Sequence, residues 1–530
     1  MKKNNKIFGL IACSAVLAGA VTVGASNLNV APAAADGDTA AVNFALAQSA
    51  SVKYGDEGGI RFAATVYQNA LSLADKVVLK SSIDKAGNTD EDEAITYEWD
   101  VTATYKTGYD TNTYYHAITF TDAELASYNL KEMAAVELTA TMWLADDEGN
   151  VLAEAQTVTR SMRAVANAIY DGVNVDKQEE LSDYFGTRYT AKAAYKEVVD
   201  DNAWVVDGGT VATAVYNGAA AVGADLTAGE TATGSYALFD AEYNVYNVPE
   251  VTYVTKVIRE ASDLATFSLT YPSSTSTDYP ILEGYYVLVN NIDASAYTHS
   301  HTRNQFNPTT STDYGFKGVF DGQGYTIDGV TLNYNGLFLK VGSGATIKNV
   351  AFINTKFNYS GNSQTRDRAV IFAHHIHGTS TEKVTIENVY IQLDTLTTEG
   401  KTWNYETFAA PMAWQVQYTT FNNVVIDYNE DLSTKMPDRT DCQYGSFVAN
   451  QNVTEVTATN TYVISPTKLQ YKQSDGSSIE ESLIKRGVVR YDNTDAFVSA
   501  MEDTEKLNAF DNEYWDITGG TPVWKTVETE

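Results

Sequence analysis

The segment Ile386-Glu387-Asn388-Val389-Tyr390-Ile391 recurs in modified form along the C-terminal half of the chain. Apolar residues fill its first, fourth and sixth positions, and an Asn stands at the third. The further copies are Ile327-Asp328-Gly329-Val330-Thr331-Leu332, Ile347-Lys348-Asn349-Val350-Ala351-Phe352, Phe421-Asn422-Asn423-Val424-Val425-Ile426 and Ala458-Thr459-Asn460-Thr461-Tyr462-Val463. Units of a few tens of residues that repeat their apolar positions are typical of a solenoid.

A Phe precedes each copy of the motif. The aligned triplets are Gly318-Val319-Phe320, Gly336-Leu337-Phe338, Val370-Ile371-Phe372, Glu406-Thr407-Phe408 and Gly445-Ser446-Phe447. One coil of a parallel β-helix cannot bury its own apolar side, so we expect Phe to stack on Phe and Val on Val between coils. We expect Asn349, Asn388, Asn423 and Asn460 at a recurring bend, because Asn tolerates left-handed backbone angles and its amides can form a ladder.

The open end of such a stack needs a cover, because exposed strand edges promote association between molecules. Asn493 or Thr494 is suited to cap a helix that presents Phe497, Met501 and Leu507 on one face. We expect this helix to close the C-terminal end of the stack.

The N-terminal residues follow a different period. Apolar and polar residues alternate in Ile60–Val66, in Tyr97–Tyr105 and in Val136–Met142, as in strands of an antiparallel sheet with one wet face. We predict a β-sandwich over residues 36–175, ending in a helix that contains Met162 and Ile169. Residues 176–251 are expected to be a helical and small β connector, with a helix from about Lys177 to Asp201. Residues 252–530 are the predicted β-helix with its C-terminal cap.

The first residues have the features of an export signal. Basic residues at Lys2, Lys3 and Lys6 precede an apolar run and then small residues that suit cleavage, so residues 1–35 are predicted to be a signal peptide. The protein is therefore expected to be secreted and associated with the cell envelope. Attachment of a lipid at Cys13 is the less favoured alternative. No later segment has the run of about 20 apolar residues that a membrane span needs.

The charge and the cysteine content argue against a nucleic-acid partner and against an internal disulfide. The chain has 68 acidic and 36 basic residues and a net charge of −32 at pH 7. This field repels polyanions, so we exclude a nucleic-acid partner. Once the signal is removed only Cys442 remains, so we expect no disulfide within the chain.

Residues ahead of the repeats complete a family pattern. They are Tyr285-Tyr286-Val287-Leu288-Val289-Asn290-Asn291-Ile292-Asp293, Phe316-Lys317-Gly318-Val319-Phe320-Asp321-Gly322-Gln323-Gly324-Tyr325-Thr326-Ile327, Gly336-Leu337-Phe338 and Ile347-Lys348-Asn349-Val350. With the closing Trp515-Asp516 and Gly520-Thr521-Pro522-Val523-Trp524, residues Val254 to Lys525 resemble the GLUG-type right-handed β-helix of bacterial surface proteins. The resemblance implies a spacer, an adhesive stalk or an appendage of an enzyme. The metal-binding peptidase domain of some such proteins needs His-Glu-x-x-His, which this sequence lacks.

A second, looser resemblance concerns the N-terminal region. Gly58-Gly59-Ile60-Arg61-Phe62 with Val158-Thr159-Arg160-Ser161-Met162 is similar to a β-sandwich module of secreted proteins from Gram-positive gut bacteria. That module implies no chemistry.

Two sets of residues are candidates for ligand binding. His299 with His301, and His375 with His377, stand two residues apart, so each pair shares a strand face and offers two imidazoles to a transition metal. Tyrosine faces suit stacking on sugar rings, and the candidate tyrosines near the first coil are Tyr271, Tyr279, Tyr285 and Tyr297. The alternative is surface and loop roles for the histidines, and core or sheet packing for most of the tyrosines.

No catalytic set emerges from the sequence. Asn493-Thr494-Asp495 follows His377-Gly378, the reverse of the order in polygalacturonase-type hydrolases, and Arg-Ile-Lys is missing. Arg366-Asp367-Arg368 matches the base of pectate lyases only nominally. We therefore predict a non-catalytic structural or adhesive protein that binds glycans or surface proteins and needs no cofactor, with Ca²⁺ or a transition metal as an alternative. The second candidate is a carbohydrate-active enzyme, a polysaccharide lyase or glycoside hydrolase, on the same helix.

Overall fold

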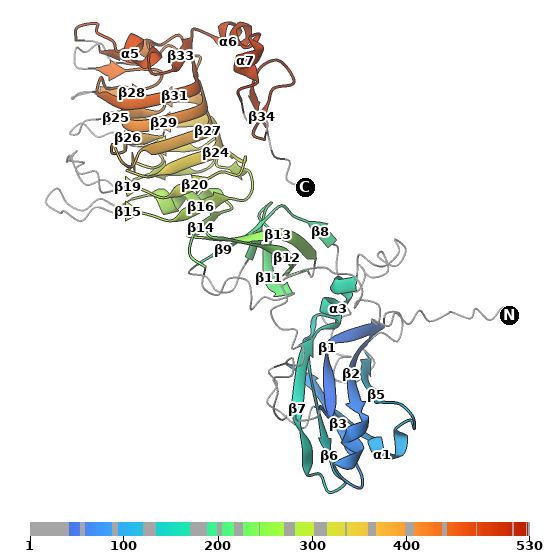
Figure 1. Ribbon diagram of the computed structural model, residues 1–530. Helices are drawn as coiled ribbons and strands as arrows, with labels where there is room; N and C mark the ends of the chain where they lie inside the picture. Colours follow the sequence, from blue (N-terminus) through green and yellow to red (C-terminus); the bar gives the residue numbers. More distant parts are fainter. Residues whose placement is uncertain are drawn as a thin grey trace, which may run out of the picture. The chain divides into compact units, whose positions relative to one another are not determined.

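The computed structural model is mainly β, with a few short helices (Figure 1). The residues it describes are 42–53, 59–86, 94–119, 134–169, 188–198, 204–216, 226–242, 244–269, 281–301, 315–333, 336–358, 367–370, 372–397, 407–436, 442–472, 474–510, 513–525 and 527. The predicted export signal and Cys13 lie outside them. Among the described helices, none is both long enough and apolar enough to cross a bilayer.

The chain divides into two compact units. The N-terminal unit comprises Met1–Lys192, Ala212–Ala224 and Ala232–Glu250, and the C-terminal unit comprises Ala193–Val211, Asp225–Thr231 and Val251–Glu530. The connector predicted for residues 176–251 thus contributes to both units.

Two antiparallel sheets form the first part of the N-terminal unit. One has the order β1 (Phe44–Lys53), β2 (Gly59–Tyr67), β5 (Thr111–Thr119); the other has the order β4 (Ile95–Asp100), β3 (Val78–Lys85), β6 (Leu138–Ala145), β7 (Val151–Arg160). Alternate residues of both sheets enter one hydrophobic cluster, which contains Phe62, Leu79 and Met142. The finer assignment to a β-sandwich stays a prediction.

Of two elements predicted for this unit, the helix forms as expected and the strand is shorter than expected. Helix α3 (Met162–Ile169) forms as expected, and Met162 packs into the hydrophobic cluster. The alternation from Tyr97 to Tyr105 is not one strand: β4 stops at Asp100, whose side chain accepts a hydrogen bond from Ala103 N at 2.9 Å and caps helix α1 (Val101–Thr104). The capping carboxylate overrides the strand pattern here.

The connector contains more β-strand than predicted. Its strands are β8 (Arg188–Thr190), β9 (Ala194–Glu197), β10 (Trp204–Val206), β11 (Val211–Tyr216), β12 (Thr231–Asp240) and β13 (Val245–Val254), in the sheet order β12-β11-β10-β9-β13-β8. The expected helix from Lys177 to Asp201 is wrong over residues 188–197, which form β8 and β9. Tyr195 explains part of the difference, because it is a buried aromatic residue that favours a strand, and it pairs with Val205 of β10.

Parallel strands dominate the C-terminal unit and form a large sheet consistent with a β-helix (Figure 1). The longest row of hydrogen-bonded strands is β14 (Lys256–Ile258), β16 (Tyr285–Leu288), β20 (Val319–Asp321), β24 (Thr346–Asn358), β27 (Val384–Thr397), β29 (Ala413–Asp427), β31 (Val453–Ile464) and β33 (Val488–Tyr491). A further row is β15 (Ile281–Leu282), β19 (Gly315–Phe316), β23 (Lys340–Val341) and β26 (Ala373–His377), which pairs with the start of β29.

Shorter parallel rows complete each coil. They are β17 (Ile292–Asp293) with β21 (Thr326–Asp328), β18 (Thr298–Ser300) with β22 (Thr331–Asn333), and β25 (Asp367–Val370) with β28 (Thr407–Ala410) and β30 (Gln443–Tyr444); β32 (Tyr471–Lys472) pairs antiparallel with β30. Phe, Ile, Leu and Val from successive coils enter one continuous hydrophobic cluster. The expected stacking of apolar residues between coils is therefore confirmed.

The register confirms four of the five aligned motif copies. Ile347 pairs with Ile386, Ile386 with Phe421, and Phe421 with Ala458. The copy at Ile327 was aligned wrongly, because Ile327 pairs with Phe352, the last residue of the next motif. The first coils have more residues between these rows than the later coils, so one fixed offset does not fit them all.

The series of five Phe residues is also only partly correct. Phe320 belongs to the row of Ile347, whereas Phe338 donates its backbone N–H to Phe372 O at 3.1 Å in a different row. Met412 takes the position expected for Phe408, since Phe372 and Met412 immediately precede the paired residues Ala373 and Ala413. Met412 can fill the same kind of apolar site as Phe. A search for repeated Phe residues therefore selects Phe408 in place of Met412.

The Asn residues form the predicted ladder. Asn349, Asn388, Asn423 and Asn460 have φ angles of 56°, 48°, 53° and 45°. Each of the last three donates from Nδ2 to Oδ1 of the preceding one, at 3.2, 3.0 and 3.1 Å. Both parts of the expectation, left-handed backbone angles and stacked amides, are confirmed.

The C-terminal residues cover the side of the coils. Helix α6 (Thr494–Met501) is capped by Asn493, whose side chain accepts from Ala496 N at 2.9 Å, as expected. However, Phe497 and Met501 pack with outward-facing residues of several coils, including Tyr462, in a cluster separate from the coil interior.

The tail continues along this flank to the first coils, through α7 (Thr504–Leu507), β34 (Trp515–Asp516) and β35 (Val523–Trp524) (Figure 1). Trp524 Nε1 donates to Gly324 O at 3.0 Å, and Asn291 Nδ2 donates to Val527 O at 2.7 Å. At the end of the stack it is Leu483, from α5 (Glu480–Ile484), that enters the interior cluster. The expected closure of the end by α6 is therefore corrected.

Candidate functional site

The predicted tyrosines do not form one exposed surface in the described residues. Tyr271 and Tyr279 lie outside the described part of the chain. Tyr285 is half-buried, and its hydroxyl donates to Asp321 Oδ2 at 2.7 Å. Tyr297 is also half-buried, with its ring centroid 6.2 Å from that of His299, and burial raises the pKa of Tyr297.

Asp321 is a buried carboxylate with several donors around it. It is 2% exposed, and Lys348 Nζ lies 2.9 Å from the oxygen that also accepts from Tyr285. Its other oxygen accepts from Asn349 Nδ2 at 3.0 Å and from Gln323 N at 3.1 Å. Burial, followed by the charge of Asp321, raises the pKa of the nearby Tyr195. A carboxylate with both oxygens engaged in this way organises the first coils.

The first histidine pair is buried between coils. His299 and His301 have ring centroids 5.0 Å apart, so they do share a face. Leu269 N donates to His301 Nδ1 at 3.1 Å, and His301 Nε2 donates to Gly336 O at 2.8 Å. Both ring nitrogens of His301 are thus used by the backbone, which leaves no lone pair for a metal.

Burial controls the protonation of this pair. It lowers the pKa of His301 to about 4, against a small opposing effect of the Gly336 carbonyl. Burial and then the charge of His301 lower the pKa of His299 to about 3, with the Leu337 backbone acting in the opposite direction. Both imidazoles are neutral at pH 7.

The second histidine pair lies on β26 beside an aromatic residue that the sequence did not single out. The rings of His374 and Trp414 stack at 4.9 Å, and the His375 ring meets Trp414 edge-on at 4.7 Å. His375 pairs in register with Lys340, whose side chain is 2% exposed. His377 is half-buried, and burial together with the Lys340 charge lowers its pKa.

This cluster therefore joins His375 to His374 and Trp414, whereas the sequence grouped it with His377. The sequence around a Trp in a strand does not indicate which residues its ring will contact. Only the register of the strands shows that Trp414 lies beside His374 and His375. Arg366 lies outside the described residues, as do the side chains of Asp367 and Arg368. In the described part of the chain, no three His, Cys, Asp or Glu side chains come together in a way that could hold a metal ion.

The most regular polar surface of the coils has two parallel rows. We call it the lateral polar face, and its residues are Thr346, Thr385, Thr420 and Thr457 in the first row and Lys348, Glu387, Asn422 and Thr459 in the second. Neighbouring strands lie about 4.8 Å apart, so each row repeats at that interval. The rows point away from the interior, because the residues between them, such as Ile386 and Phe421, belong to the core.

The lateral polar face is accessible and ordered. Thr385 and Thr420 are half-buried and Thr457 is exposed. Asn422 Nδ2 donates to Glu387 Oε1 at 2.9 Å, so the second row is fixed by contacts between coils. This arrangement presents hydroxyl, amide and carboxylate groups at a constant spacing, which suits an extended polar ligand.

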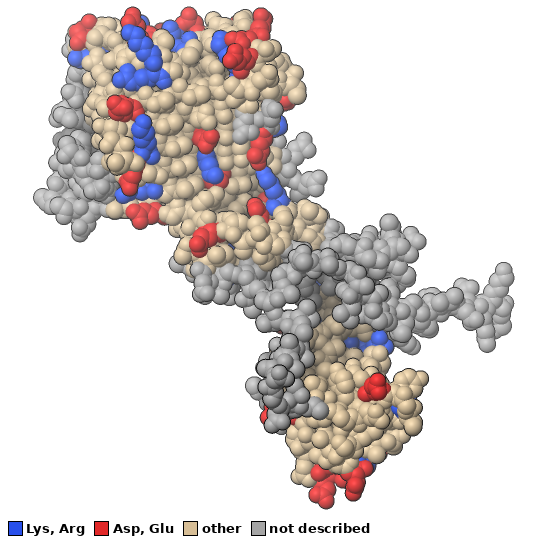
Figure 2. Space-filling view, viewed as in Figure 1, with Lys and Arg blue, Asp and Glu red and all other residues tan. Residues whose placement is uncertain are grey.

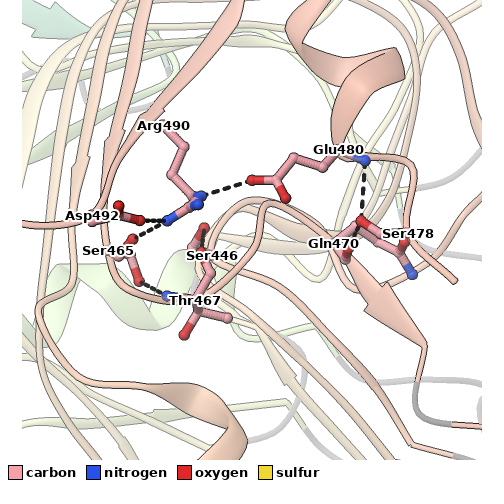
Figure 3. Close-up of polar contacts among 8 residues, drawn as sticks. All are labelled: Ser446, Ser465, Thr467, Gln470, Ser478, Glu480, Arg490 and Asp492. Atoms are coloured by element: carbon pink, nitrogen blue, oxygen red, sulfur yellow. Dashed lines mark hydrogen bonds and ion pairs between the residues drawn. The ribbon is translucent and has the colours of Figure 1, made fainter. Parts of the chain in front are cut away.

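A polar network fastens the C-terminal end of the stack (Figure 3). Arg490 Nε lies 2.7 Å from Glu480 Oε1, and Arg490 Nη1 donates to Ser465 O at 2.9 Å and also contacts Asp492. Ser465 Oγ accepts from Thr467 N at 3.2 Å. The contacts of Arg490 with Glu480 and Ser465 join different segments of the last coils, so we assign the network to structure.

A second part of the same network surrounds Gln470, which is fully buried. Its Oε1 accepts from Ile479 N at 3.2 Å and its Nε2 donates to Ala449 O at 3.3 Å. Ser478 bridges the Gln470 carbonyl and the backbone of Glu480. These bonds satisfy buried polar groups where the regular coils end.

These features define a mainly β protein with a large parallel sheet and a regular polar flank. Comparison with models of protein families, with curated proteins and with solved structures finds no match for the chain.

Proposed function

We propose that this chain is an exported, non-catalytic surface protein whose parallel coils present the lateral polar face to glycans or surface proteins. The observation that carries the proposal is the register of Thr346, Thr385, Thr420 and Thr457, which aligns like groups on successive coils. Repeated weak contacts at a fixed spacing favour a ligand that is itself extended. A right-handed β-helix of the GLUG type is the finer fold that we propose for these coils.

The charge of the surface supports an uncharged ligand. On the face of the coils that Figure 2 shows, most of the described surface is neither acidic nor basic, and the charged residues lie in small separate groups. The net charge of −32 disfavours polyanions in general. Neutral polysaccharides and weakly charged proteins therefore fit better than acidic polymers.

The test is to incubate the purified protein, with and without Ca²⁺, with plant, mucin and bacterial polysaccharides, and to assay depletion and product release together. We expect depletion of at least one polysaccharide without new reducing ends or unsaturated products. Release of products would replace this proposal with the carbohydrate-active enzyme.

Variants link the binding to the lateral polar face. Thr385→Arg and Thr420→Arg each place a bulky cation in the middle of the first row, and we expect either to weaken binding about tenfold. Thr381→Arg is the matched control, because Thr381 is exposed in a turn of the same coil, outside both rows. Equal effects of all three variants, or none, would contradict the proposal.

A further inference from the structure

Two aromatic residues of the N-terminal unit lie where its core meets solvent, and one of them, Trp99, packs against the hydrophobic cluster. The ring of Tyr97 is 53% exposed, although it lies on the same face of β4 as the half-buried Trp99. The two ring centroids are 4.7 Å apart, with their planes tilted by 57°. An exposed Tyr ring beside a half-buried Trp ring is more informative than a scattered apolar residue.

The platform formed by Tyr97 and Trp99 is rigidly supported. The His116 ring lies 5.9 Å from Tyr97 and 6.1 Å from Trp99, and its Nδ1 is 2.8 Å from Ser81 Oγ. Tyr114 meets Trp99 edge-on at 6.0 Å. Because Ser81 and His116 come from different sheets, both sheets position the platform before any ligand arrives, which lowers the entropic cost of binding.

The acidic residues of β4 lie on the face of the strand opposite the rings. Ile95, Tyr97 and Trp99 alternate with Thr96, Glu98 and Asp100 along β4, so the acidic residues of this strand point to the opposite face. There Glu98 lies 2.9 Å from Lys80 Nζ. The rings therefore offer an apolar face and polar edges without a charge from their own strand.

The size of the platform indicates the kind of ligand. Two partly exposed aromatic side chains offer on the order of 200 Å², whereas a stable protein interface needs roughly 800 Å² from each partner. One sugar ring matches the smaller area, because its apolar face can stack on an aromatic ring while its hydroxyl groups stay in water.

We infer that Tyr97 and Trp99 form a binding platform for a neutral glycan, separate from the lateral polar face. One pyranose ring stacks on Tyr97 and contacts the edge of Trp99. This site does not depend on the function proposed for the coils.

The test measures binding of the full chain to xyloglucan, galactomannan, starch and arabinoxylan by affinity electrophoresis in native gels. We expect Tyr97→Ala to raise the dissociation constant for at least one of them tenfold or more. Tyr115→Ala is the matched control: Tyr115 is 49% exposed and lies on β5 between Tyr114 and His116, so it points away from the platform. We expect it to change the dissociation constant less than twofold.

Fluorescence provides a second readout. Trp99→Phe retains an aromatic ring, so we expect the folded protein to keep part of its affinity but to lose the change in emission that the polysaccharide produces. Melting temperatures of all variants check that they fold. Absence of binding to all four polysaccharides, or equal effects of Tyr97→Ala and Tyr115→Ala, overturns the inference. Loss of binding only in Thr385→Arg and Thr420→Arg overturns it too, while supporting the lateral polar face.

Discussion

Asn349 donates from Nδ2 to Oδ1 of Asp321 at 3.0 Å, and this bond begins a chain of side-chain amides that crosses the coils. At the far end, Asn460 Nδ2 also donates to Ala509 O at 2.9 Å. A carboxylate only accepts hydrogen bonds, so Asp321 fixes the direction in which every amide of the ladder points. The ladder thus ties the first coils to the C-terminal flank.

We expect Asn388→Ala to lower the free energy of unfolding of the coils by about 2–4 kcal/mol. Ala in the left-handed region costs about 1–2 kcal/mol, and the neighbouring amides lose a buried partner. Asn388→Gly keeps the backbone angle and loses only the amide, so its effect should be about half as large. Urea titrations followed by tryptophan fluorescence measure both. If Gly and Ala were equally destabilising, the backbone angle would have no part in the effect.

Asp321→Asn tests the start of the ladder. The variant keeps most of the volume but leaves Lys348 without its buried counter-charge and allows the amides to reverse. We expect a loss of about 2–4 kcal/mol, somewhat below the roughly 3–5 kcal/mol seen when one partner of a fully buried ion pair is removed, because the Lys348 side chain is 32% exposed. Tyr285→Phe, which removes a single hydrogen bond to the same carboxylate, should cost only about 1 kcal/mol. A loss in Asp321→Asn no larger than in Tyr285→Phe would argue against this role.

The buried histidines should make the coils sensitive to acid. The pKa of His299 is lowered to about 3 and that of His301 to about 4, while the unfolded chain titrates near 6.5. Below pH 6.5 the unfolded state binds more protons than the folded state, so stability falls as the pH falls from 6.5 toward 4. We expect these two groups to remove about 3–4 kcal/mol between pH 7 and pH 5.

His301→Gln provides the control for this pH dependence. It removes one of the two titrating groups, so the slope of stability against pH over that window should fall by about half, whatever the stability at pH 7. Denaturant titrations at several pH values give the slope directly. An unchanged slope would show that other groups cause the acid sensitivity.

The C-terminal tail should stabilise the coils through Trp524. Its ring packs against Trp515 at 5.1 Å, and its Nε1 bonds to Gly324 O. We expect Trp524→Ala to cost about 3–5 kcal/mol, the usual range for loss of a buried Trp. Val523→Ala is the neighbouring control, since Val523 is 60% exposed and should change stability by less than about 0.5 kcal/mol. Similar losses in both variants would mean that the tail acts without its aromatic anchor.

Much less of the candidate sites than of the architecture could be predicted. The sequence predicts ligand-binding roles for Tyr285 and His301, yet both are hydrogen-bonded to groups from other coils. Nothing in the sequence pattern singles out Trp414, although it packs against His374 and His375. Such partners are separated by tens of residues, and their meeting depends on the length of each turn between strands.

The sequence by itself determined the repeat, the stacking of Ile347, Ile386 and Phe421, and the ladder of Asn residues. These follow from local periodicity and from the tolerance of Asn for left-handed angles, and both are properties of short segments. Only the tertiary structure decided that Ile327 pairs with Phe352 and that α6 packs on the flank of the coils. The register of coils of unequal length and the position of a tail depend on contacts between distant segments, which no short stretch of sequence encodes.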